Sequence, residues 1–340
     1  MTAAPNDPRS PVTRTSKIGL WGASGSGKTT YLASLFVAAT QSRPRRWNIA
    51  GENQESVEFL THKTNTLTEE RRFPKFTQGI QNLSWTVMGT TERTVKKRFG
   101  KTVETVPLRF RLDMLDAEGG LYESPSENRD EGDEGDLDIE FDDVRHGDPE
   151  RLIDQLTECD GIIYLFDPLR ENKKGDAYRH FQWALQNILS RAARNGTIDG
   201  MYLRHHLAVC VTKLDDPKVF HTADKLRYLV TDPEDPYQFP RVRDDYAEDL
   251  FRKLGELSPT RSAVKVHDAI QAAFHPGRVR YFATSAVGFY LERGAQRCRW
   301  ENFQNVVRHP TIKDEYQIRG DINPINVLEP LLWLGQVTSR

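Results

Sequence analysis

The chain has 340 residues, of which 37% are hydrophobic and 28% charged, a balance typical of a globular protein and unlike that of a collagen, a coiled coil or a membrane bundle. At about 150 residues per domain, this length allows two domains, or one enlarged by insertions. The formal net charge is −2, and the sequence has no excess of lysine and arginine of the kind that would predict a nucleic-acid partner. No apolar run approaches the roughly 20 residues that span a bilayer, and the three cysteines form no CxxC pair. We therefore expect a cytoplasmic protein with neither a membrane nor a nucleic-acid partner.

The first half of the chain alternates strand-like and helix-like segments after a Pro/Ser/Thr-rich tail at residues 1–15, which we expect to be disordered. Residues 16–21 form an apolar run typical of a short buried strand, and residues 28–41 carry apolar side chains at helical spacing. Residues 43–72 follow as a polar insertion in which we expect one helix. Two β-branched and aromatic runs within residues 83–116, joined by a glycine-containing turn, then predict a β-hairpin.

The middle of the chain opens with an acidic insertion at residues 120–147. Within it, residues 123–143 contain eleven acidic residues and one arginine, which predicts a solvated loop. Beyond it, helices and strands alternate regularly, and we expect them at residues 149–158 (helix), 161–167 (strand), 175–194 (helix) and 206–212 (strand).

The last part of the chain contains a Pro-rich, charged segment at residues 216–277, which we interpret as a helical insertion. Its candidate helices lie near residues 220–230, 243–257 and 262–273. A strand is expected at residues 279–285 and an apolar helix at residues 323–337. Because helices alternate with short apolar strands, we expect right-handed crossovers and a mostly parallel sheet. The sequence therefore predicts an α/β fold with helices on both faces of the sheet and one antiparallel hairpin edge.

The first strand is followed by the sequence GASGSGKT at residues 22–29, which fits the phosphate-binding pattern G-x-x-x-x-G-K-[ST] without a gap. Glycines at these positions let backbone N–H groups surround phosphate oxygens, and the following helix N-terminus adds a partial positive charge. Lys28 is expected to reach the β- and γ-phosphates, and the Thr29 hydroxyl to ligate Mg²⁺. The residues expected to bind the phosphates are Gly22, Ser24, Gly25, Ser26, Gly27, Lys28, Thr29 and Thr30.

A second motif, D-x-x-G, runs from Asp116 to Gly119 at the end of the second hairpin strand. Here a carboxylate can hold Mg²⁺ through water, and a glycine N–H can meet the γ-phosphate. Asp113 is the competing carboxylate. Its other interpretation is a strand residue paired with Arg109 or Arg111. The glycine three residues after Asp116 favours Asp116 as the metal-binding residue.

A third motif, TKLD, directly follows the strand at residues 206–212 and is suited to recognising a base. The carboxylate of Asp215 can accept both the N1–H and the N2 amino hydrogens of guanine, whereas adenine offers no such donor pair. The aliphatic part of Lys213 is expected to lie along the base, next to Thr212. Ser285 and Ala286, just after the last expected strand, can offer backbone N–H groups to the guanine carbonyl.

The motifs GASGSGKT, DAEG, TKLD and TSA occur in the order found in P-loop GTPases of the TRAFAC class, and the chain resembles this family over residues 16–288. It is most similar to the bacterial double-GTPase family, which has a comparable Asp167-Pro168 pair and a comparable C-terminal helix. The resemblance implies a single P-loop NTPase G domain over residues 16–340. It also implies GTP or GDP as ligand, Mg²⁺ as cofactor, and a protein effector or a second G-domain protein as partner.

The resemblance also implies a switch threonine that ligates Mg²⁺, for which Thr77 is the best candidate; Thr86, Thr90 and Thr91 are the alternatives. With Lys28 and Gly119, Thr77 completes the expected catalytic set. Ras-like members place a glutamine after the D-x-x-G glycine to orient the attacking water, but here that position is Gly120. We therefore expect slow hydrolysis unless Glu118, Glu123, an insertion residue or a partner supplies the missing group.

Three functions follow from these motifs. The first is a GTP-binding molecular switch with slow or partner-stimulated hydrolysis, which the resemblance places among bacterial regulatory or conflict-system GTPases. The second is an assembly module that binds GTP without hydrolysing it, as the glycine at position 120 suggests. The third is a P-loop ATPase or kinase, for which TKLD and TSA would be coincidental. Base preference separates the third from the first two, and single-turnover hydrolysis separates the first from the second.

Overall fold

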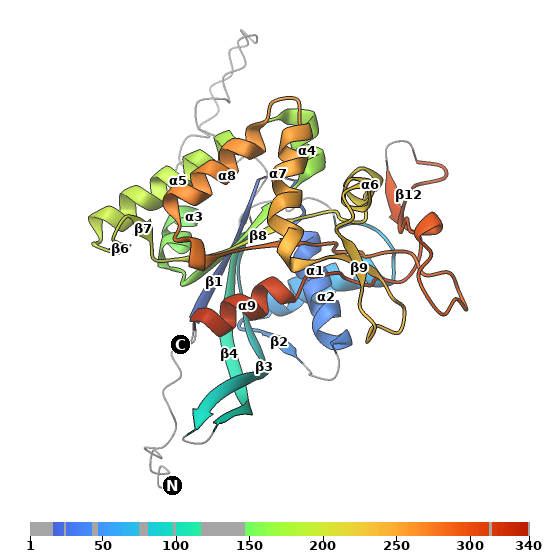
Figure 1. Ribbon diagram of the computed structural model, residues 1–340, viewed down its shortest axis with the longest axis horizontal. Coiled ribbons are helices and arrows are strands. Elements are labelled where there is room, and N and C mark those ends of the chain that lie inside the picture. The colour runs from blue at the N-terminus through green and yellow to red at the C-terminus, as the bar shows by residue number, and fades with distance from the viewer. Residues whose placement is uncertain are drawn as a thin grey trace.

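The computed structural model describes most of the chain, which folds into helices arranged around one large sheet (Figure 1). The described residues are 16–23, 25–42, 47–74, 81–97, 100–116, 147–312 and 315–338. Among them, no helix combines the length and the apolar character needed to cross a lipid bilayer.

The central sheet has seven strands in the order β11-β8-β5-β1-β4-β3-β2. These strands are β11 (Val279–Ala283), β8 (His206–Val211), β5 (Gly161–Phe166), β1 (Ser16–Gly22), β4 (Gly100–Asp116), β3 (Gln81–Lys97) and β2 (Asn48–Gly51). All neighbours from β11 to β4 are parallel, whereas β3 is antiparallel to both β4 and β2. The mostly parallel sheet with an antiparallel hairpin edge, expected from the sequence, is confirmed.

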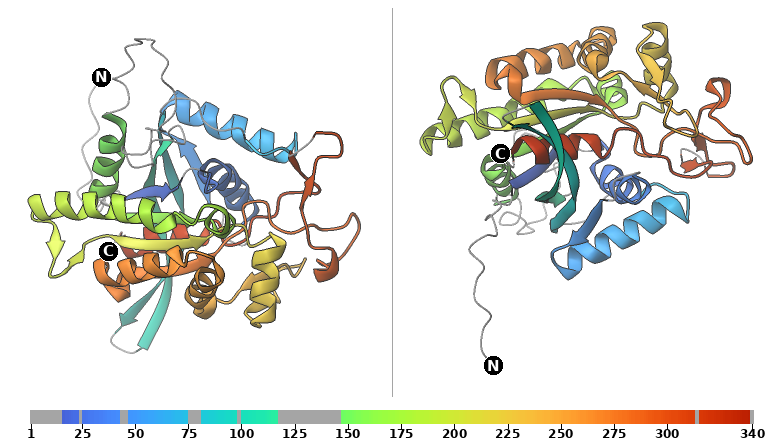
Figure 2. Two further views of the ribbon diagram at one scale, coloured as in Figure 1. Left: turned by 90° about the horizontal axis from the view of Figure 1, so that it is seen from above. Right: turned by 60° about the horizontal axis from the view of Figure 1, so that its bottom comes forward.

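Helices cover both faces of the sheet, as Figure 2 shows from two further directions. Successive side chains of β5 point to opposite faces: Ile162, Tyr164 and Phe166 join one apolar core, and Ile163 and Leu165 join the other. The helices of the first core are α3 (Gly147–Glu158), α5 (Ala177–Arg194), α6 (Pro217–Lys225), α7 (Ala247–Leu257) and α8 (Ser262–Ala273). Those of the second core are α1 (Lys28–Gln41), α2 (Gln54–Thr68) and α9 (Glu329–Thr338). The fold is therefore the expected α/β arrangement of a sheet between two helical layers.

Shorter elements connect these layers. They are α4 (Pro168–Lys174), β6 (Ile198–Asp199), β7 (Tyr202–Leu203), β9 (Leu229–Thr231), β10 (Pro240–Val242), η1 (Asp244–Tyr246), η2 (Pro276–Arg278), η3 (Trp300–Asn302), β12 (Val306–Arg308) and β13 (Tyr316–Ile318).

Residues 43–72 contain the expected helix, α2, and also the edge strand β2, which the sequence did not predict. Four residues are too few to show strand alternation. The strand is held by pairing with β3 and by Trp47, which precedes it and is buried. The ring of Trp47 lies against Gly89 of β3, where a Cβ would come within 2.3 Å of it. A glycine at this position therefore allows the indole to pack on the strand backbone.

The helices of the second half differ from expectation where the chain makes tight turns. The helix expected around residues 175–194 is α5, which begins at Ala177; the separate short helix α4 precedes it, because Gly175 between them adopts a φ of 64°. The helix expected near residues 220–230 is α6, which ends at Lys225 and is followed by the β9–β10 hairpin. Helices α7 and α8 lie where the sequence predicted them.

The C-terminal helix is shorter than the expected residues 323–337, because α9 begins at Glu329. The preceding residues are non-helical: Ile325 forms an antiparallel bridge with Ser285, and Asn326 adopts a φ of 50°. An extended residue before Pro324 is also sterically favoured. The apolar spacing of residues 323–337 therefore predicted one helix, although the first residues of this range form a loop and only those from Glu329 on are helical.

Candidate functional site

Five parallel strands, β1, β4, β5, β8 and β11, end at the same side of the sheet. Their last residues are Gly22, Asp116, Phe166, Val211 and Ala283. Each predicted motif begins at or directly after one of these ends. The topology therefore gathers the motifs of the sequence along one end of the sheet.

The phosphate-binding pattern lies at the point where the strand order reverses. β1 is flanked by β4 and β5, and the chain passes to these neighbours by way of α1 and α3, which belong to cores on opposite faces. At such a point the loops that leave the strands diverge, and ligands of open α/β sheets bind in the crevice between them. We therefore take this end of β1 as the centre of the candidate site.

The loop between β1 and α1 has the backbone shape that its glycines allow. Gly25 and Gly27 adopt φ angles of 73° and 92°, in the left-handed region that favours glycine. Gly27 is the N-cap of α1 and makes no side-chain cap. The N-terminus of α1 therefore faces the loop with its partial positive charge uncapped by a side chain, as an anion site requires.

Lys28 is folded back over this loop. Its side chain is buried, with 7% exposure, and Nζ donates hydrogen bonds to the carbonyl oxygens of Gly22 at 3.0 Å and Ala23 at 3.1 Å. The hydroxyl of Ser26 is buried in the same loop and has no hydrogen-bond partner among the described residues. A buried ammonium and an unpaired hydroxyl inside one glycine-rich turn fit a site that receives phosphate oxygens.

The two competing carboxylates of β4 have different surroundings. Asp113 is buried, and its Oδ1 accepts hydrogen bonds from Arg111 Nε at 2.6 Å and Ser84 Oγ at 2.8 Å. Its role is therefore the strand ion pair that was the alternative interpretation. Asp116 is the last residue of β4, and Gly22 is the last residue of the neighbouring β1. Asp116 thus lies at the same end of the sheet as the phosphate loop; its side chain is outside the described part.

The loops after β8 and β11 meet at Asp215. Its carboxylate is 8% exposed, and Oδ1 accepts a hydrogen bond of 2.5 Å from Ser285 Oγ. Leu214 N also donates to Thr284 O at 3.0 Å. Burial raises the pKa of Asp215 to about 6, although the Ser285 hydrogen bond works in the opposite direction. The structure therefore brings together two of the predicted base-recognition residues and fixes one oxygen of the carboxylate.

Lys213 is held by a residue to which the sequence assigned no role. Its backbone adopts a φ of 60°, and Nζ donates a 2.5 Å hydrogen bond to Asp167 Oδ2. The other oxygen of Asp167 caps α4 by accepting from the backbone N–H groups of Leu169 and Arg170. Thr212 Oγ1 donates to Phe166 O at 3.0 Å. The turn after β5 therefore positions the TKLD loop.

Asp167 could have been noticed in the sequence as a helix start, because an acidic residue followed by proline at the end of a strand is a common N-cap arrangement. The ion pair of Asp167 with Lys213 could not have been predicted from the sequence. The two residues are far apart in the chain and meet only because β5 and β8 are neighbours in the sheet.

The direction of β3 determines which of the candidate switch threonines can lie near the site. This strand enters at the site, where Gln81 pairs with Asp116, and then runs away from it. At about 3.3 Å per residue, Thr86 lies roughly 15 Å beyond that end, and its hydroxyl donates to Glu52 Oε1 at 2.8 Å. Thr90 and Thr91 lie farther along the same strand. The direction of β3 therefore disfavours these alternatives.

Three predicted site residues, Ser24, Thr77 and Gly119, lie outside the described residues. The remaining backbone positions of the site are placed: Thr29 and Thr30 lie in the first turn of α1, and Ala286 follows Ser285 in the bend after β11.

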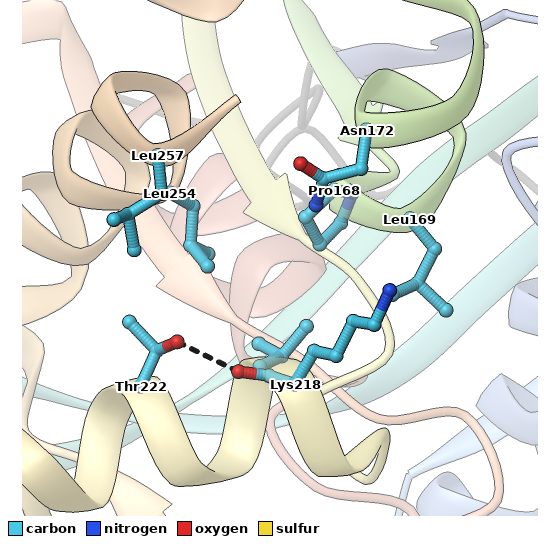
Figure 3. Close-up of a pocket in the computed structure, with 8 residues that line it drawn as sticks. Pro168, Leu169, Asn172, Lys218, Thr222, Leu254 and Leu257 are labelled. Carbon is cyan, nitrogen blue, oxygen red and sulfur yellow. Dashed lines mark hydrogen bonds between the residues drawn. The ribbon is translucent and has the colours of Figure 1, made fainter. Parts of the chain in front are cut away.

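A separate pocket of about 360 Å³ lies between α4, α6 and α7 (Figure 3). Apolar side chains of Leu169, Leu254 and Leu257 line it together with Lys218, whose carbonyl accepts a 2.7 Å hydrogen bond from Thr222 Oγ1. None of its lining residues belongs to the predicted nucleotide motifs. We therefore assign it no part in nucleotide binding.

Comparison with solved structures finds small GTPases among the similar chains. The Arl6 BBS3 small GTPase from Trypanosoma brucei, solved with bound GppNp, has 11% identity and a TM-score of 0.36; the match covers 96% of this chain and 98% of that chain. The signal recognition particle receptor SRb-GTP/SRX complex from Chaetomium thermophilum has 15% identity and a TM-score of 0.34, with 85% and 97% covered. Era in complex with MgGDPNP and a 16S ribosomal RNA fragment has 14% identity and a TM-score of 0.27, with 63% and 46% covered.

No protein-family model and no curated protein sequence matches the chain. At these TM-scores and identities, the fold is established by the strand order and by the loop between β1 and α1. The chain is thus an α/β protein that carries a glycine-rich loop, of the pattern predicted to bind phosphate, at the switch point of its sheet.

Proposed function

We propose that this protein is a GTP-binding molecular switch with slow or partner-stimulated GTP hydrolysis. The observation that carries the proposal is the buried carboxylate of Asp215, bonded to Ser285 at the same end of the sheet as the phosphate loop. A carboxylate in this position has a second oxygen to offer to paired N–H donors, which guanine has and adenine lacks.

The phosphate end of the nucleotide would lie over the glycine-rich loop. Backbone N–H groups at Gly25 and Gly27 and the N-terminus of α1 would bind its oxygens, and Lys28 would exchange its present carbonyl partners for the β- and γ-phosphates. Moving the ammonium from neutral carbonyls to anionic oxygens strengthens its hydrogen bonds.

The chemistry of the donor set fits Mg²⁺, which prefers hard oxygen ligands and keeps part of its water shell. The Thr29 hydroxyl, the Asp116 carboxylate and the Thr77 hydroxyl are the residues that would hold it. When bound, it would neutralise charge on the phosphates. Thr77 precedes β3, which enters the sheet at this end. That placement supports Thr77 over the threonines inside the strand.

Gly120 at the position of the usual water-orienting glutamine supports slow intrinsic hydrolysis. It equally favours the second candidate function, an assembly module that holds GTP without turning it over. A protein effector or a second G-domain protein would supply the missing group in the first case, as in a bacterial regulatory or conflict system. Single-turnover hydrolysis with Lys28→Ala as the inactive control separates the two functions.

The first test is competition of unlabelled GTP and ATP for a fluorescent guanine nucleotide in the presence of Mg²⁺. We expect wild type to prefer GTP, and Asp215→Asn to reduce that preference by at least about 100-fold, because the amide has no charge, has one acceptor oxygen in place of two, and turns an NH2 donor toward the guanine donors. The neighbouring Asp216→Asn is the matched control. Asp216 caps α6 through the Lys218 N–H, a role that asparagine can also fill.

Equal competition by ATP in wild type would contradict guanine recognition and favour a P-loop ATPase. So would an Asp215→Asn variant with unchanged preference.

A further inference from the structure

We propose that residues 323–327 and Tyr31 form a positioning element that holds the base-recognition loop, residues 284–288, at a fixed place relative to the phosphate-binding helix α1. The proposal rests on the proposed function and deepens it. It concerns the residues that keep the two halves of the nucleotide site in register, without touching the nucleotide themselves.

The base-recognition loop is bonded along its length to the segment before α9. Ser285 N donates to Ile325 O at 3.0 Å, and Ile325 N donates back to Ser285 O at 2.9 Å. Asn323 N donates to Val287 O at 3.1 Å, and Asn326 Nδ2 donates to Ala283 O at 3.2 Å. Three of these hydrogen bonds reach the loop itself, and the fourth reaches Ala283 at the end of β11, so the segment and the loop lie side by side as paired strands do.

The contact is also close enough to require glycine. At Gly288, whose φ is 67°, a Cβ would lie 1.6 Å from the carbonyl oxygen of Asn323. The Gly288 N–H donates to Ser285 Oγ at 2.8 Å, and this same hydroxyl donates to Asp215. The backbone of the C-terminal segment therefore sets where the Ser285 hydroxyl lies, and with it the orientation of the Asp215 carboxylate.

Tyr31 connects this segment to the phosphate end of the site. It is 2% exposed, and its hydroxyl donates a 2.7 Å hydrogen bond to Val327 O. It follows Lys28 by three residues on α1, and such residues lie on the same side of a helix. Farther along α1, Gln41 Nε2 donates to Ile322 O at 3.1 Å. The helix that carries the phosphate-binding lysine thus holds the C-terminal segment at its last residue, Val327, and at Ile322, directly before its first.

These contacts form a continuous path: Tyr31 to Val327, the 323–327 segment to Ser285, and Ser285 to Asp215. The covalent frame of one nucleotide limits how far its phosphates and its base can lie from each other. A small displacement of the base loop relative to α1 would therefore weaken base recognition even if every contacting residue were kept. Loosening the path should lower guanine selectivity, whereas binding by the phosphates alone should persist.

The test compares affinities for GDP and ADP in the presence of Mg²⁺, in wild type, Tyr31→Phe and Asn326→Ala. We expect each variant to bind GDP about 3- to 10-fold more weakly, the effect of one buried hydrogen bond, with ADP affinity unchanged. Tyr228→Phe is the matched control, because it removes a tyrosine hydroxyl that donates to Asp249 in a different part of the fold. Its GDP-to-ADP ratio should equal that of wild type.

A role in folding alone would lower thermal stability without changing the GDP-to-ADP ratio, so an unchanged ratio in both variants overturns the proposal. Tyr31→Phe keeps the ring and its packing, and it decides the question if Asn326→Ala fails to fold. A wild type without any preference for GDP would instead overturn guanine recognition itself, and this inference with it.

Discussion

In the proposed guanine site, Asp215 would have to be both buried and negatively charged, and these two requirements oppose each other. Removing a carboxylate from water favours its protonated form, which raises the pKa of Asp215 to about 6. Guanine recognition needs the opposite form, because only the carboxylate accepts two N–H donors through its free lone pairs. Nucleotide binding at this residue should therefore be coupled to proton release just below neutral pH.

We accordingly expect the ratio of GDP to ADP affinity to fall as the pH drops below about 6, by up to about tenfold per pH unit. The sign follows from the raised pKa: the ligand-free protein takes up a proton first, and the protonated acid lacks one acceptor that guanine needs. Using the ratio removes the titration of the phosphates, which both nucleotides share. Isothermal titrations from pH 8 to pH 5 measure it. A ratio that stays constant in wild type, as expected for Asp215→Asn, would contradict the coupling.

The loop after β11 and the segment before α9 are in such close contact that adding one methyl group at Gly288 should force them apart. Gly288→Ala places a Cβ against the Asn323 carbonyl and also puts a side chain at a φ of 67°. Gly196→Ala has the matching φ of 64° but meets nothing within 4 Å. The backbone term of about 1 kcal/mol is therefore common to both variants.

We expect Gly288→Ala to lower the free energy of unfolding by at least about 2 kcal/mol more than Gly196→Ala, since a backbone carbonyl must move to admit the methyl group. GDP affinity should fall in the same variant only. Urea unfolding followed by circular dichroism, together with GDP titration, checks both outcomes. Equal losses in the two variants would mean that the loop and the segment separate easily.

The parts of the fold that follow from local pattern could be read from the sequence. Apolar runs predicted the parallel strands, and the glycine spacing of residues 22–29 predicted the tight loop between β1 and α1, because both depend on neighbouring residues only. Contacts between distant segments could not be read. The Asp167–Lys213 ion pair exists because β5 and β8 are neighbours in the sheet, and the bridge from Ser285 to Ile325 joins the loop after β11 to the segment before α9.

The same limit explains the misplaced elements. β2 is a strand because β3 lies beside it, and residues 323–328 leave the helical pattern because they pair with the base-recognition loop. In each case a partner elsewhere in the fold outweighs the local preference of the sequence. Residues that reach the candidate site through such long-range pairings can be identified only from the structure.

The sheet divides the interior into two apolar cores, and the proposed nucleotide site depends on both. The phosphate loop leads into α1, which packs in one core, whereas Leu214 of the TKLD loop is buried in the other. A nucleotide that binds both loops should therefore stabilise the chain as one cooperative unit, in agreement with the predicted single domain.

Two buried cysteines report on the cores separately. Cys159 lies in one core and Cys210 in the other, and burial raises the pKa of both thiols well above the usual range. Native thiols of this kind react with alkylating reagents only after the surrounding structure opens. Replacing the third cysteine, by Cys298→Ser, leaves these two as the reporters.

With GDP and Mg²⁺ present at 100 times the dissociation constant, we expect both thiols to be labelled about 100-fold more slowly, because binding to the folded state alone adds about 2.7 kcal/mol to its stability. Mass spectrometry of the alkylated peptides gives the two rates separately, and ADP at the same concentration is the control. If GDP protected Cys210 but not Cys159, the two cores would open independently. The nucleotide would then stabilise only the core in which α1 and Cys210 lie, and the chain would consist of two cooperative units instead of one.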